Sequence, residues 1–275
     1  MRKVDRASVD YPNKLQNLSD VNLGHLHDHT KISGSIYAHA EVLDSLQGLY
    51  FDKCYICEGD VSSGRFNVEH YLPKKLFPHL GYSWENLHKA CEGCNLAKES
   101  REFFIYDEND ICTGIKLLDP SSTLYDISHY MRFNIDSEAE SVPMGIEVDI
   151  KLKASNTISY LNGKYKSEYG KELKFLRSKK SVQFLRFFSD KLVKYRERIR
   201  DIKMLGIGNY VAPVDSEALE VDQDLCQLLI NVDDTYLSDK APFSSCTRVQ
   251  VFPTMRVTYQ ELFCIKENMR VVLGI

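Results

Sequence analysis

Two pairs of cysteines in the first half of the chain have the spacing of a metal site. The pairs are Cys54/Cys57 and Cys91/Cys94, each with two residues between the thiols. Structural zinc is held by four such ligands in a tetrahedron, and the ligands come as close pairs on tight turns. With cysteine at all four positions the ion has no open coordination site. We therefore predict a structural Zn²⁺ ion, with an iron–sulfur cluster or coincidental thiols as the alternatives.

Polar side chains of a different kind lie between and beside these pairs. They are one carboxylate, one imidazole and two amides: Glu69, His70, Asn86 and Asn95. Carboxylate and amide oxygens are hard ligands that suit Mg²⁺ or Mn²⁺. A neutral imidazole with an ordinary pKa of about 6.5 can accept a proton from water at physiological pH. The segment therefore predicts a second, oxygen-rich site separate from the cysteines.

The whole stretch from Cys54 to Lys98 resembles the HNH, or ββα-metal, nuclease family. Residues 68–73 (VEHYLP) resemble the first strand of that family, and residues 84–87 (WENL) resemble its central element. Residues 94–98 (CNLAK) resemble the start of its helix, with Asn instead of His at the last motif position. The resemblance implies a zinc-stapled ββα-metal finger and a metal-dependent endonuclease.

The resemblance also implies a role for each polar residue. His70 would be the general base, while Glu69 and Asn95 would hold a catalytic Mg²⁺ or Mn²⁺ ion. Adjacent residues on a strand point to opposite faces, so a strand that carries both Glu69 and His70 must bend or end there, or Glu69 must reach the ion from the side. Asn86 would bond the backbone across the loop and hold His70 in place.

Two lysines of the same segment are candidate nucleic-acid contacts. The resemblance implies that Lys74 and Lys98 lie near the phosphate. Residues 71–74 read YLPK, whereas the family usually has Phe or Arg directly before Pro-Lys. One basic contact of the family is therefore expected to be absent from this chain.

Further segments resemble a particular HNH group, the PtuB-type nucleases of Septu anti-phage systems and of related retron systems. They are residues 1–9 (MRKVDRASV), 117–120 (LLDP) and 156–162 (NTISYLN). This resemblance implies a toxic effector that cuts DNA, or RNA such as tRNA, under the control of an ABC/SMC-like ATPase of the PtuA type. A retron RNA–DNA complex is a further possible partner. The alternatives are a catalytically inactive zinc-finger adaptor and a restriction-type HNH enzyme with its own sequence specificity.

The composition agrees with a soluble protein of the reducing cytoplasm. Of the 275 residues, 43% are hydrophobic and 27% are charged, which is ordinary for a globular protein. No apolar run approaches the roughly 20 residues of a membrane span, and the N-terminus has no secretory signal. We expect a cytoplasmic location, no membrane contact, and cysteines that bind metal instead of forming disulfides. Residues 24–30 (GHLHDHT) are interpreted as a polar loop instead of another metal site.

The elements around the finger are predicted to be mainly helical, which makes the fold class α+β. We divide the chain into an N-terminal arm and helix at 1–50 for partner docking, the HNH domain at 51–105, and a mostly helical region at 106–275. Residues 142–152 alternate apolar and polar side chains, which predicts a half-buried strand.

The longest predicted helical segment, residues 155–204, is strongly basic. Between Lys151 and Lys203 there are sixteen Lys and Arg against five Asp and Glu, although the net charge of the chain is −4. Such a block fits nucleic acid, an acidic partner or a solvated helix face. We expect Gly170 and the region of Ser181 to interrupt the helix.

Overall fold

The strands of the computed structural model pair into small antiparallel hairpins in the first half of the chain. The structure describes residues 1–19, 32–61, 66–98, 101–163 and 168–275. Within these ranges there are three two-stranded sheets, and their strands are β1 (Phe66–His70), β2 (Leu87–Cys91), β3 (Phe104–Tyr106), β4 (Cys112–Ile115), β5 (Met131–Phe133) and β6 (Ala139–Ser141).

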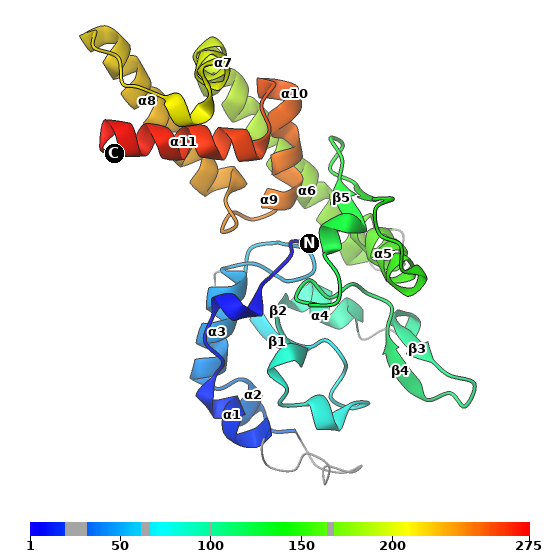
Figure 1. Ribbon diagram of the computed structural model, residues 1–275. Coiled ribbons are helices and arrows are strands. Elements are labelled where there is room, and N and C mark those ends of the chain that lie inside the picture. The colour runs from blue at the N-terminus through cyan, green and yellow to red at the C-terminus, as the bar shows by residue number, and fades with distance from the viewer. Residues whose placement is uncertain (20–31, 62–65, 99–100, 164–167) are drawn as a thin grey trace. The chain divides into compact units, whose positions relative to one another are not determined.

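Helices make up most of the remaining structure (Figure 1). Those before residue 162 are α1 (Asn13–Ser19), α2 (Gly34–Tyr37), α3 (Ala40–Tyr50), α4 (Glu92–Lys98) and α5 (Val148–Leu161). Those of the second half are α6 (Glu168–Phe187), α7 (Arg196–Leu205), α8 (Ser216–Val232), α9 (Ser244–Thr247), α10 (Val251–Met255) and α11 (Tyr259–Leu273). The fold is therefore a mixture of helices and small sheets, as the sequence predicts. None of the helices in the described ranges is both long enough and apolar enough to cross a membrane.

The chain forms two units that each have a core of their own. The first contains Met1–Arg132 and Ala139–Lys174, and the second contains Phe133–Glu138 and Phe175–Ile275. All the predicted site residues belong to the first unit. The predicted docking role of residues 1–50 stays a prediction.

The hairpin of β1 and β2 is the frame of the first unit. Its strands are antiparallel, with Glu69 opposite His88 and His70 opposite Leu87. The next residue after β2 begins α4, so strand, strand and helix follow one another in the order β1, β2, α4 (Figure 1). Lys89 is buried in β2, and its ammonium donates to the carbonyl of Phe51 at 2.7 Å. This contact fixes the C-terminal end of α3 beside the hairpin.

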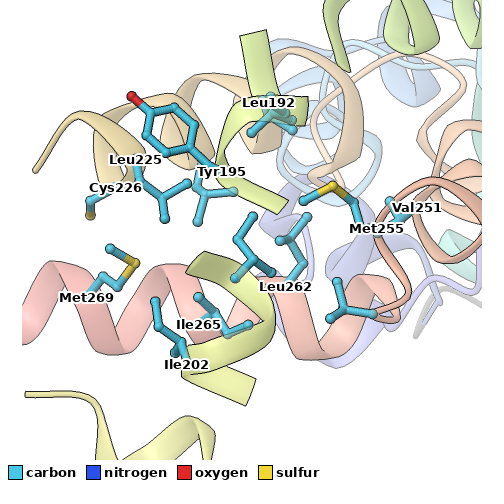
Figure 2. Close-up of a cluster of buried hydrophobic side chains, with 14 of the residues drawn as sticks. Leu192, Tyr195, Ile202, Leu225, Cys226, Val251, Met255, Leu262, Ile265 and Met269 are labelled. Carbon is cyan, nitrogen blue, oxygen red and sulfur yellow. The ribbon is translucent and has the colours of Figure 1, made fainter. Parts of the chain in front are cut away.

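The second unit is a helical bundle around one apolar cluster. Leu192, Ile202 and Leu225 meet the buried face of α11 in this cluster. Figure 2 shows Leu262, Ile265 and Met269 pointing from α11 into it. The spacing of these three residues, three and four apart, places them on one side of a helix. Burial of this stripe explains why α11 is helical, and Thr258 begins the helix with a capping box that includes Glu261.

Two predictions about secondary structure are wrong. Residues 148–152 belong to helix α5, and Leu152 is 57% exposed instead of half-buried in a strand. The buried residues of α5 lie further on, at Ala154, Thr157 and Tyr160. These residues are three apart, which is the spacing of one helix face. Their packing in the first unit therefore overrides the alternation of apolar and polar side chains at 142–152.

The predicted long basic helix is also divided differently. α6 runs without a break through Ser181, and Gly170 lies inside it. The interruption comes at 188–192, where a π-helical turn precedes α7. A π-turn inserts one extra residue, which keeps Phe188 and Leu192 on the buried side.

Candidate active site and zinc centre

The four predicted cysteines meet at one point. The sulfurs of Cys54, Cys57, Cys91 and Cys94 all lie within 4.8 Å of one another. Those of Cys57 and Cys91 are 3.9 Å apart. Tetrahedral zinc with Zn–S bonds of 2.3 Å requires sulfurs about 3.8 Å apart. The predicted grouping is confirmed: the cysteines are positioned to bind a metal ion, and their geometry is consistent with structural zinc.

Local hydrogen bonds shape both cysteine turns. In the first turn the amide of Glu58 donates to the carbonyl of Cys54 at 3.0 Å, and the amide of Gly59 donates to Cys57 Sγ at 3.3 Å. In the second, the amide of Cys94 donates to Cys91 Sγ at 3.4 Å. Amides that point at sulfur stabilise thiolates, the form that binds metal. The backbone therefore prepares the site before an ion arrives.

A tyrosine of α5 also contacts the cysteine cluster. The hydroxyl of Tyr160 donates to Cys94 Sγ at 3.3 Å, and both residues are buried. Burial raises the pKa of Tyr160 well above its usual value, so the hydroxyl keeps its proton. Tyr160 lies in the 156–162 segment, and this contact ties that segment to the metal site.

Replacing this tyrosine is expected to weaken zinc binding. Tyr160→Phe removes one hydrogen bond to a ligand, and partners of that kind are worth about tenfold or more in metal affinity. Competition with a chromophoric zinc chelator measures the change. Tyr71→Phe is the matched control, since it removes another buried hydroxyl, which donates to the carbonyl of Leu117 at 2.6 Å. Equal zinc affinity in the two variants would contradict a role for Tyr160.

Glu69 and His70 line the same cavity of about 320 Å³. His70 is the last residue of β1, where it is still paired with Leu87, and Glu69 and His70 both reach the cavity although they are adjacent on the strand. Lys74 and Lys98 line the cavity as well. A carboxylate, an imidazole and the ammonium groups of Lys74, Lys75 and Lys98 therefore surround one space large enough for a phosphodiester group.

A backbone hydrogen bond and burial set the protonation state of the His70 imidazole. Its Nε2 lies 2.9 Å from the carbonyl oxygen of Gly81. A carbonyl can only accept, so Nε2 carries the proton and Nδ1 is left as the acceptor. Burial lowers the pKa of His70 to about 4, and the ammonium groups of Lys74 and Lys98 add to this. The ring is therefore neutral at physiological pH, as a general base must be.

Asn86 links the two sides of the loop that follows His70. Its Oδ1 accepts from the amide of Leu72 at 2.7 Å. Its Nδ2 donates to the carbonyls of Leu72 at 2.9 Å and Leu80 at 3.1 Å. Leu80 precedes Gly81, whose carbonyl holds His70. Asn86 thus fixes the segment that carries the acceptor for His70.

Loss of this amide is expected to destabilise the first unit. Asn86→Ala removes three hydrogen bonds of a buried side chain, at about 1 kcal/mol each, so the free energy of unfolding should fall by about 3 kcal/mol. Trp84, the only tryptophan of the chain, is 3% exposed and reports this unfolding by fluorescence in urea. Glu85→Ala, at the exposed neighbour, should change the value by no more than about 0.5 kcal/mol. Equal free energies of unfolding for Asn86→Ala and Glu85→Ala would contradict the linking role of Asn86.

Lys98 lies inside the protein and contacts the proposed metal ligand. It is 2% exposed, and its ammonium forms an ion pair with Glu69. It also donates to the carbonyls of His70 and Tyr71, the latter at 3.0 Å. These contacts hold the end of β1 against α4. The predicted phosphate contact of Lys98 stays a prediction.

Asn95 is half-buried on α4 and is not among the residues that line this cavity. Glu69 is then the one proposed oxygen ligand in the cavity, and Lys98 already pairs with it. As placed, these residues do not form the oxygen-rich cage that Mg²⁺ or Mn²⁺ prefers. The catalytic ion stays a prediction.

Comparison with known proteins gives a short similarity. A segment of 53 residues is 40% identical to a curated protein named Septu protein PtuB from Bacillus thuringiensis. The matched segment covers 18% of this chain and 21% of the length of that relative. No family model matches the chain, and no solved structure matches it.

Sequence reasoning missed one residue that contacts the site. Tyr37, at the end of α2, lies against His70 with ring centroids 4.8 Å apart. No motif or spacing marks it, because it comes from a segment more than thirty residues before His70. The three histidines at 24–30 lie outside the described residues.

Proposed function

We propose that this chain is a nuclease of an anti-phage defence system, with its catalytic centre in the cavity of Glu69 and His70. The observation that carries the proposal is the state of His70. A neutral imidazole has its proton fixed on Nε2 by the carbonyl of Gly81, which leaves Nδ1 as its accepting nitrogen. The order β1, β2, α4 beside a four-cysteine cluster supports the ββα-metal finger as its frame.

The chemistry proposed is hydrolysis of a phosphodiester bond. Nδ1 of His70 takes a proton from a water molecule, and the hydroxide attacks phosphorus. The bond to the leaving oxygen breaks, and that oxygen takes up a proton. Lys74 places a positive charge at the cavity, where it can stabilise the phosphate in the transition state. A positioned base contributes about 10²–10⁴-fold, so charge stabilisation and positioning must supply the larger part.

A defence role and a partner belong to the same proposal. The similarity to the Septu protein supports the defence role. The resemblance further implies control by an ABC/SMC-like ATPase, and the chain itself has no phosphate-binding loop of the Walker type. We propose that the ATPase restrains the nuclease until infection.

Incubation of the zinc-loaded chain with plasmid DNA and with tRNA tests the activity. Reactions contain Mg²⁺, Mn²⁺ or EDTA, and the zinc content is checked after each one. Cleavage that requires the added ion supports the nuclease and the predicted catalytic ion together. Cleavage that persists in EDTA supports the nuclease without the ion. No cleavage in any reaction, with the ATPase present or absent, would favour the adaptor.

The inactive adaptor remains the second candidate because one observation favours it: the carboxylate of Glu69 is already paired with Lys98. A centre in this state can hold its shape without binding a catalytic ion. An adaptor would bind a partner or nucleic acid equally well after His70→Ala, whereas a nuclease would lose its cleavage products.

A further inference from the structure

The segment before α3 packs closely on the loop that holds His70. The side chain of Ile32 lies so near Gly81 that a Cβ built there would come within 2.8 Å of Ile32 carbons. The hydroxyl of Tyr82 accepts from the amide of Ser33 at 2.8 Å. Glycine at 81 allows this approach, and the carbonyl of Gly81 is the one that holds His70. Residues 32–37 are therefore fixed against the candidate active site.

Tyr37 ends this segment and contacts two residues of the cavity. Its ring is nearly perpendicular to the imidazole of His70, at 79° with centroids 4.8 Å apart. Its hydroxyl accepts from Lys74 Nζ at 2.5 Å. The same ammonium lies over the Tyr37 ring, 4.1 Å from its centroid. One aromatic side chain thus joins the candidate base to a candidate phosphate contact.

We propose that Tyr37 is the positioning residue for both His70 and Lys74 in the reaction. This inference rests on the proposed function. The hydrogen bond to Gly81 fixes one atom of the imidazole, but the ring can still rotate about that bond. The perpendicular contact with Tyr37 fixes the ring plane, and so the direction in which Nδ1 accepts a proton.

The contact with Lys74 acts on the substrate instead of on the base. A free lysine side chain loses up to about 2 kcal/mol of rotamer entropy when it becomes ordered. Because Tyr37 already holds the ammonium at the cavity, a phosphate that binds Lys74 meets a cation in place. The hydroxyl of Tyr37 should therefore affect substrate affinity, and its ring should affect the chemical step.

Two substitutions separate these effects in the full, zinc-loaded chain. Tyr37→Phe keeps the ring and removes the hydroxyl, so KM for nucleic acid should rise about threefold to tenfold with little change in kcat. Tyr37→Leu removes both contacts, so kcat should also fall, by about tenfold or more, because small misplacements of a reacting group cost up to 10²-fold. Tyr11→Phe is the control, since Tyr11 packs near Trp84 and does not line the cavity.

A double variant distinguishes positioning from general support of the fold. If Tyr37 acts on kcat through His70, then Tyr37→Leu should lower kcat no further in a His70→Ala protein. A purely structural residue would lower it by the same factor in both backgrounds. Urea unfolding followed by Trp84 fluorescence shows whether each variant is folded. If Tyr37→Leu is unfolded, the kinetics of Tyr37→Phe still test the inference.

The imidazole ¹⁵N spectrum of His70 gives a readout that does not need turnover. We expect the signature of the Nε2–H form in both the wild-type chain and Tyr37→Leu, because Gly81 fixes that proton. The ¹⁵N resonances should shift and broaden in Tyr37→Leu, because the ring plane is no longer held. An unchanged spectrum, or unchanged kcat and KM in both Tyr37 variants of an active enzyme, would overturn the inference alone. Absence of cleavage by the wild-type chain would instead overturn the proposed function.

Discussion

Replacing Cys94 by serine is expected to release zinc and to unfold the first unit of the chain. Cys94 is buried, and its sulfur is one of four within 4.8 Å of one another. Structural zinc contributes about 10–16 kcal/mol in finger peptides. Whole domains are stable by only about 5–15 kcal/mol. The stabilisation free energy lost with the ion is therefore larger than the remaining contacts of this unit can supply.

Metal analysis and tryptophan fluorescence measure both parts of this result. The wild-type chain should carry one zinc ion, and Cys94→Ser close to none, with Trp84 emission shifted to that of an unfolded chain. Cys112→Ser is the matched control, because Cys112 is a half-buried thiol of the same unit outside the cluster. It should keep its zinc. A folded Cys94→Ser protein without zinc would show that the ion is dispensable for the fold.

Replacing His70 by alanine is expected to lower cleavage by about 10²–10⁴-fold, the usual contribution of a positioned general base. The substitution removes the one imidazole among the described residues that line the cavity. The side chain is 5% exposed, so a change in stability is measured alongside. Initial rates with a labelled oligonucleotide, at equal zinc content, give the effect.

An exposed histidine of the same loop provides the comparison. His79 does not line the cavity, and the centroid of its ring lies 6.2 Å from that of Phe77. His79→Ala should therefore cleave at the wild-type rate. Full activity of His70→Ala, or an equal loss in both variants, would remove His70 from the mechanism.

The parts of the site that follow from local sequence were predictable. Cysteines two residues apart on tight turns present their sulfurs together, so their convergence needs little tertiary information. Glu69 and His70 were expected to serve one site, and both line the same cavity although they are adjacent on β1.

The parts that depend on packing were not predictable. Lys98 follows the family motif in sequence, but its contact with Glu69 arises only when α4 lies against β1. Tyr37 reaches His70 because residues 32–37 pack on Gly81, which no periodicity indicates. At 148–152 the alternation of apolar residues suggested a strand, whereas burial of Ala154 and Tyr160 selects a helix. Each of these outcomes depends on distant residues.

Sequencing the ends of DNA and RNA recovered from cells tests most directly whether the cavity of Glu69 and His70 cuts nucleic acid. One culture expresses the wild-type chain and the other expresses His70→Ala at the same level. We predict new 5′ and 3′ ends in one class of nucleic acid with the wild-type chain, and none of them with His70→Ala. Identical end profiles in the two cultures would contradict the account.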